Sequence, residues 1–77
     1  MTSRTQYVFV VVAYTTTYGE EIANRFIRFR ELRDCTYVNL MIALENDMHT
    51  SLSINSIVFF NEDDFNEFSK NCHIIEF

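Results

Sequence analysis

The first long hydrophobic segment of the chain is nearly uninterrupted and lies close to its start. Residues 7–14 comprise four valines, three aromatic residues and one alanine. A strand that is covered on both faces has this composition, because neither of its two alternating sets of side chains meets water. The segment therefore predicts a central β-strand over residues 6–14 with two apolar faces.

The next segment carries apolar residues at the helical period. Between residues 20 and 33, four apolar side chains fall on one face of a helix, with glutamates in its first turn and arginines in its last, as the helix dipole favours. The apolar four are Ile22, Ala23, Phe26 and Phe29. We predict a helix over residues 20–33. A strand over residues 25–32 is the competing interpretation, because Ile27 and Phe29 alternate with charged residues.

Two further segments alternate between apolar and polar residues, which is the period of a β-strand. Residues 36–45 place four aliphatic side chains on one face, and they are Val38, Leu40, Ile42 and Leu44. Residues 52–60 change parity between their two halves, so a β-bulge near residues 55–56 is needed to keep the apolar side chains on one face. Both segments are predicted to be strands.

The end of the chain predicts a short helix followed by a short strand. Asn61 and the acidic residues directly after it have the composition of a helix start, and Phe65 and Phe68 are expected to form the buried side of this helix. The helix is expected over residues 61–71, and residues 73–77 are expected to form the last strand.

These elements give the α+β order βαββαβ, which is the split βαβ or ferredoxin-like plan. In that plan a four-stranded antiparallel sheet has its first and third strands at the centre, and both helices cover one face. A chain of 77 residues with one glycine and no proline leaves room for a single domain, residues 1–77, and for no linker.

Composition limits where such a domain could act. No apolar run approaches the roughly 20 residues needed to span a bilayer, and the first residues lead into a strand without the cleavage site of a signal peptide. Cys35 and Cys72 have neither metal-ligand nor redox spacing and are expected to be reduced. We therefore expect a cytoplasmic protein that has no membrane contact, no metal and no cofactor.

The net charge of −5 is unevenly distributed along the chain. Residues 35–77 carry seven acidic residues and only Lys70 as a base, which disfavours direct nucleic-acid binding because that requires a basic face. With Phe9 on its first strand, a sheet of this topology resembles the RNA recognition motif, whose exposed aromatic residues stack on bases. Residues 54–60, however, lack the basic and glycine residues of that family's signature.

Two groups of charged residues are candidate partner-binding positions. The acidic group at the second predicted helix could meet a basic protein surface, and two arginines at the end of the first predicted helix could hold a carboxylate or a phosphate. Each group also has a structural interpretation, because acids favour the start of a helix and arginines favour its end. The candidates are Glu62, Asp63, Asp64, Glu67, Arg30 and Arg33.

A third candidate surface is the sheet face that two helices on the other face would leave open. The first strand is apolar on both sides, so its second face needs a cover. We predict a homodimer or partner interface there, and a strand sheltered by its own tyrosines is the alternative. The expected interface residues are Tyr7, Phe9, Val11, Tyr37 and Met41.

No combination of residues indicates catalysis. His49 falls in a predicted turn and His73 on a predicted edge strand, so neither is placed beside a nucleophile and an orienting acid. A single glycine leaves no glycine-rich phosphate loop. No catalytic residue is predicted, and an enzyme of the dimeric α+β barrel kind would need a polar cavity that the valine-rich first strand does not line.

The pattern is typical of a non-enzymatic protein-binding module that acts as an inhibitor or regulator by covering a basic surface of a protein partner. Small acidic inhibitors carried by phages and other mobile elements are similar in size and composition, although they share no motif with this chain. The alternative is a homodimeric small-molecule-binding regulatory domain, because paired ferredoxin-like domains commonly hold ligands at their interface. Gly19 is the one candidate for the glycine-containing turn of such domains.

Overall fold

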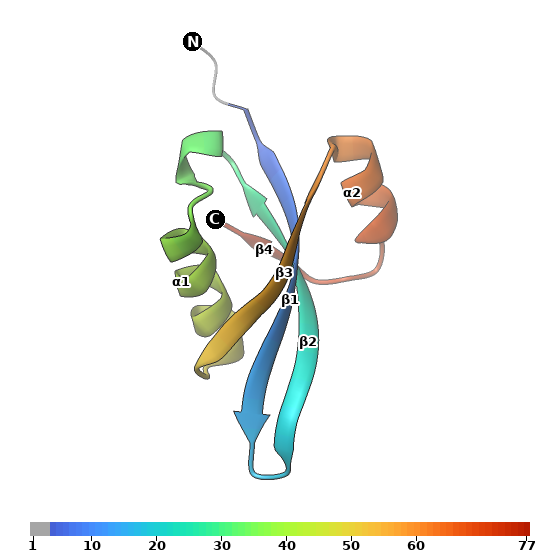
Figure 1. Cartoon of the computed structure of the whole chain (residues 1–77). Coiled ribbons are helices and arrows are strands. Elements are labelled where there is room, and N and C mark those ends of the chain that lie inside the picture. The colour runs from blue at the N-terminus through green and yellow to red at the C-terminus, as the bar shows by residue number, and fades with distance from the viewer. Residues whose placement is uncertain (1–3) are drawn as a thin grey trace.

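The computed structural model describes residues 4–77, so the start of the chain that bears on a signal peptide lies partly outside the described residues. Four strands form one mixed sheet in the order β3-β1-β2-β4, accompanied by two helices (Figure 1). The α+β class with a four-stranded sheet and two helices is therefore confirmed. The elements are β1 (Gln6–Thr16), β2 (Gly19–Phe29), the 3-10 turn η1 (Leu32–Asp34), α1 (Tyr37–Met48), β3 (Leu52–Phe60), α2 (Glu62–Phe68) and β4 (Ile74–Glu76).

The predicted helix over residues 20–33 is wrong, because this segment forms β2. It pairs antiparallel with β1 from Gly19 to Phe29, in register without interruption. The pairing buries Ile27 and Phe29 on one face and Phe26 on the other. The competing interpretation of a strand over residues 25–32 agrees better with the structure. Backbone hydrogen bonds to β1 determine the conformation of this segment, although its apolar residues have helical spacing.

The β1–β2 hairpin turns at Thr17–Tyr18. Gly19 adopts a φ of 118°, which residues with a Cβ atom disfavour.

The predicted strand over residues 36–45 is also wrong, because most of this segment lies in α1. Thr36 caps the helix by accepting a hydrogen bond from the Asn39 backbone N–H at 3.2 Å. Leu40 and Leu44 are four residues apart, a spacing that fits a helix face as well as a strand face. They are buried while Val38 is exposed, which distinguishes the helix from the strand.

These two changes give the element order ββαβαβ, so the expected ferredoxin-like order βαββαβ is not observed. The sheet is not entirely antiparallel either, because β4 runs parallel to β2, with Phe26 paired to Ile74. β2 lies at the centre beside β1, and β3 lies at an edge where a central position was expected. The predicted bulge in β3 is confirmed: Val11 pairs with Ser56 and Val12 with Ile54, which leaves Asn55 as the extra residue.

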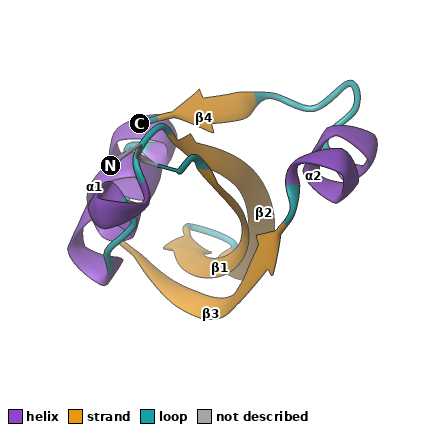
Figure 2. Cartoon of the chain, turned by 90° about the horizontal axis from the view of Figure 1, so that it is seen from above, coloured by secondary structure: helices purple, strands orange, loops and turns teal. Residues whose placement is uncertain are grey.

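The two helices cover opposite faces of the sheet, which corrects the expectation that both would cover one face (Figure 2). Val8, Val10 and Val12 of β1 pack with Leu40 and Leu44 of α1 to form the main core. On the other face of β1, Tyr7 packs on Phe65 of α2. Helix α2 therefore covers part of the second apolar face of β1. The β1–β2 hairpin projects beyond both helices (Figure 1).

Candidate functional site

Helix α2 is fixed to the sheet by one aromatic side chain. Phe65 is fully buried, and its ring centroid lies 4.9 Å from that of Tyr7 and 5.6 Å from that of Phe26. The start of the helix is capped by Asn61, whose Oδ1 accepts a hydrogen bond from the Asp64 backbone N–H at 2.8 Å. These contacts hold the two-turn helix on the sheet, as predicted from Asn61 and Phe65. The expectation that Phe68 is also buried is wrong, because its side chain is 62% exposed.

The four acidic side chains of α2 are all exposed, and they are Glu62, Asp63, Asp64 and Glu67. Within residues 4–77, none of them forms an ion pair with an arginine, lysine or histidine. The first three lie in the first turn, where the helix dipole favours negative charge. Glu67 lies in the last turn, where the dipole disfavours it. The result is an acidic surface of which one carboxylate has no structural explanation.

The two candidate arginines are not brought to this surface. Arg30 is exposed just after β2, and the guanidinium of Arg33 pairs with the Glu31 carboxylate at 2.5 Å. Arg33 belongs to η1, which lies on the α1 side of the sheet, shown in green in Figure 1, while α2 lies on the other side. The acidic and basic candidates are therefore two separate surfaces.

The five residues expected at a sheet-face interface are also separated. Tyr7 packs on Phe65 of α2, and Phe9 lies between Phe26 and Phe60, with centroids 5.0 and 6.3 Å away. Val11 is half-buried on the same face. The remaining two residues lie on α1, on the opposite side of the sheet, because their segment is a helix: they are Tyr37, which is exposed, and Met41, which is half-buried.

Two neighbouring apolar side chains are exposed on the edge strand β3: Val58 is 42% exposed and Phe59 is 62% exposed. The sequence did not reveal this edge, because β3 has the uncharged composition of a central strand. Strand order depends on pairing between segments that are distant in the sequence, so the local pattern of apolar and polar residues does not predict it.

An ionic cluster connects the end of α1 to the last segment of the chain. Asp47 accepts a hydrogen bond from Arg25 Nε at 3.0 Å, and its second oxygen lies 3.5 Å from His73 Nε2. Cys72 lines a cavity of about 230 Å³ beside this cluster. Within residues 4–77, no hydrogen bond joins the Cys72 thiol to the His73 imidazole, so Cys72 lacks the contact that activates a cysteine nucleophile. The contacts of Asp47 with Arg25 and His73 attach the segment before β4 to β2 and α1.

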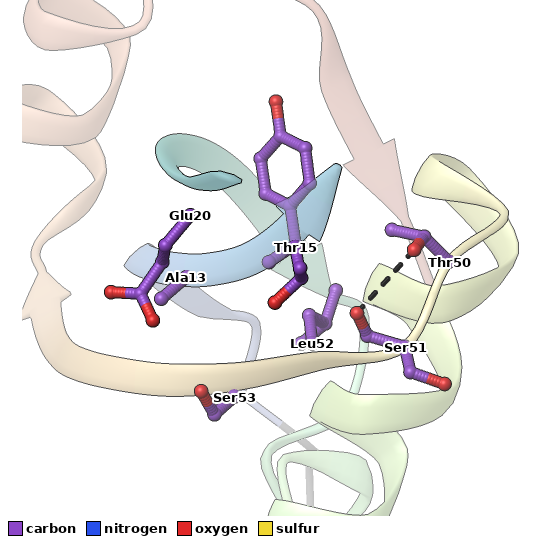
Figure 3. Close-up of a pocket in the computed structure, with 8 residues that line it drawn as sticks. Ala13, Thr15, Glu20, Thr50, Ser51, Leu52 and Ser53 are labelled. Carbon is purple, nitrogen blue, oxygen red and sulfur yellow. Dashed lines mark hydrogen bonds between the residues drawn. The ribbon is translucent and has the colours of Figure 1, made fainter. Parts of the chain in front are cut away.

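A cavity of about 410 Å³ forms an open hollow at the base of the projecting hairpin (Figure 3). Hydroxyl groups of Thr15, Thr50, Ser51 and Ser53 line it, with Glu20 as its one charged lining residue. The Thr50 hydroxyl donates to the Ser51 carbonyl at 3.4 Å, so it is partly used within the loop. The hollow can offer hydrogen bonds to a small polar molecule, but it does not enclose one.

The cysteines are not bonded to each other, and Cys35 is partly covered by the main core. This burial raises the pKa of the Cys35 thiol and so disfavours the reactive thiolate. Among the described residues, no group of three or more His, Cys, Asp or Glu side chains could hold a metal ion. Neither α1 nor α2 is long and apolar enough to cross a membrane.

Comparisons of this chain with protein-family models, with curated proteins and with solved structures find no match.

Proposed function

We propose that the protein is a non-enzymatic protein-binding domain that presents helix α2 to a basic surface of a protein partner. In this role it acts as a small acidic inhibitor or regulator, of the kind that phages and mobile elements carry. The observation that supports this proposal most strongly is the C-terminal end of α2. There Glu67 and Phe68 are both exposed, whereas Phe65 is the buried residue of the helix.

Glu67 is unfavourable for the helix on its own. A carboxylate in the last turn lies near the negative end of the helix dipole, which typically costs a few tenths of a kcal/mol to about 1 kcal/mol. No cation within residues 4–77 offsets this with an ion pair. A basic side chain of a partner would remove the penalty, and it would also interact with the three carboxylates of the first turn.

Phe68 gives the acidic surface an apolar anchor. Its ring stacks on Phe60 with centroids 5.4 Å apart and an interplanar angle of 14°, yet the residue is 62% exposed. Binding energy in protein interfaces concentrates in such aromatic side chains, while surrounding charges select the partner and speed up association. An exposed aromatic residue that stacks on a neighbouring ring beside carboxylates has the composition of a small binding surface.

The proposal is tested by capture at two salt concentrations with matched variants. The immobilised protein is exposed to lysate, and each captured protein is then purified and titrated against wild type, an α2 variant and a control. The α2 variant carries Glu62→Gln, Asp63→Asn, Asp64→Asn and Glu67→Gln; the control carries Glu20→Gln and Glu45→Gln, which are exposed acids elsewhere. We expect a Kd at least about tenfold weaker for the α2 variant, and also for wild type when salt rises from about 0.15 M to about 0.5 M.

The control is expected to keep the wild-type affinity. Equal affinity of wild type and the α2 variant for every captured protein would contradict the proposal. Loss of affinity in both variants would mean that overall charge matters rather than the surface of α2.

A second candidate is the homodimeric regulatory domain that binds a small molecule. The hydroxyl-lined hollow beside the hairpin favours it, because its volume falls within the range of roughly 300–1,000 Å³ that is common for ligand sites. A thermal-shift screen of polar metabolites distinguishes this candidate. A compound that stabilises wild type but not Ser53→Val would support it, and a screen without a stabilising compound would remove it.

A further inference from the structure

Among residues 4–77, the outer edge of β3 is the longest strand edge that has no pairing partner. The order β3-β1-β2-β4 leaves β3 bonded to β1 on one side only. β3 is nine residues long, whereas β4 at the other edge has three residues, one of which is Glu76 in an ion pair with Arg28. A row of unpaired backbone N–H and C=O groups is a template for another strand.

The usual devices that protect an edge are nearly absent from β3. Proteins protect edge strands with charged side chains, proline or a bulge. The strand contains no charged residue and no proline, and its bulge at Asn55 affects only the first half. From Ser56 to Phe60 the pairing with β1 is regular. The second half of β3 is therefore a regularly paired and uncharged edge.

This half of the edge also exposes apolar side chains on both faces of the sheet. Val58 is opposite Phe9, so it lies on the α2 face, and Phe59 is opposite Val8, so it lies on the α1 face. On the α1 face, residues 42, 43, 46 and 47 of α1 line a cavity with β4. By helix geometry the opposite flank of α1, which carries Tyr37 and Met41, is the one turned away from β4 and toward the β3 side of the sheet.

We infer that a second copy of this chain pairs antiparallel with the Ser56–Phe60 edge of β3 and joins the two sheets into one. The backbone edge is a template for another strand, and β3 carries no charge that would repel its own copy. Pairing about a twofold axis at Val58 places Ile57 opposite the partner's Phe59. It also places the exposed Val58 side chains of the two copies directly opposite each other.

The acidic helices do not oppose this arrangement. α2 begins four residues beyond Val58, which is about 14 Å along the strand at 3.4 Å per residue. The two acidic helix starts are then about 27 Å apart, well beyond the screening length of about 8 Å at physiological salt. The twofold axis is perpendicular to the sheet, so both α2 helices lie on the same face of the joined sheet and stay exposed.

The inference does not depend on the proposed function of α2, and its test keeps the two apart. The mass in solution is measured by light scattering at about 5 μM and about 500 μM. We expect the apparent mass at the higher concentration to approach twice the chain mass of 9.2 kDa. Val58→Lys is expected to remain a monomer, because it places two like charges opposite each other at the axis.

The matched control is Val38→Lys, an exposed valine on the outer face of α1, which is expected to dimerise like wild type. The variant with the neutralised α2 is likewise expected to dimerise. In case Val58→Lys fails to fold, amide exchange of wild type gives a second measurement: residues 56–60 should exchange more slowly at the higher concentration. A monomer at both concentrations, or a dimer whose residues 56–60 gain no protection, would overturn the inference.

Discussion

At the scale of single residues, Phe65 determines whether α2 has a fixed position. It is the only buried residue of the helix, and it contacts aromatic side chains of both central strands. Phe65→Ala is expected to destabilise the protein by about 3–5 kcal/mol, because it leaves a cavity and releases the helix. Urea denaturation measures this loss. Phe68→Ala removes a largely exposed ring and should cost about 1 kcal/mol or less. Equal losses for the two variants would mean that α2 is not held by Phe65.

Gly19 has a similarly local role in the hairpin. Its φ of 118° lies where side chains are strained, although a Cβ there would meet no atom within 4 Å. Gly19→Ala is therefore expected to destabilise the protein by about 1–2 kcal/mol through backbone strain alone. Thermal unfolding followed by circular dichroism measures the loss, with Thr17→Ala as a control in the same turn. Unchanged stability would show that the turn relaxes to another conformation.

At the scale of elements, the attachment of β4 to β2 depends on an ion pair and is expected to respond to pH. The Arg28 guanidinium hydrogen-bonds to the Glu76 carboxylate and holds the pKa of Glu76 below its ordinary value. A carboxyl group whose pKa is lowered by folding stabilises the folded state at neutral pH. This stabilisation is lost as pH falls through the lowered pKa.

Wild type should consequently lose more stability than Glu76→Gln between about pH 6 and about pH 3. Denaturant melts at several pH values give the comparison, and the difference is expected to be small because both side chains are partly exposed. Parallel stability curves for the two proteins would mean that the ion pair does not contribute in solution.

The sequence predicted an element correctly where the local pattern of apolar and polar residues favours the same structure as the strand pairing or the helix cap. The valines of β1 have strand composition in any context, and Asn61 with its acids caps α2 through local hydrogen bonds. The parity change in β3 correctly required the bulge at Asn55, because one extra residue is the simplest way to return the apolar side chains to one face.

The two wrong predictions concern residues 20–33 and residues 36–45. In both segments the apolar residues fit the period of a helix and also that of a strand. Ile22 and Phe26 have helical spacing, yet β2 gains its stability from continuous pairing with β1, which no window of local sequence contains. Leu40 and Leu44 suit both periods equally. Exchanging helix and strand over these segments also changed the strand order, and that error moved β3 from the centre of the sheet to its edge.

At the scale of the whole molecule there are two candidate surfaces, the acidic helix α2 and the edge of β3. The sequence indicated the first surface and did not indicate the second. The acids of α2 were recognisable because first-turn acids are both local and exposed. The apolar edge at Val58 and Phe59 was not recognisable, because it exists only through the arrangement of the other three strands. The molecule is elongated, with extents of 47 × 25 × 17 Å, and it presents these two surfaces on different elements.

The central claim is that α2 is the surface that meets a protein partner. The most direct measurement is a titration of isotope-labelled protein with a captured partner, followed by amide chemical shifts. We expect the largest changes in residues 61–69, with smaller ones at the hairpin base and at the outer face of α1. Unchanged α2 amides, together with large changes at the hollow beside Thr50 and Ser53 or along α1, would contradict the claim.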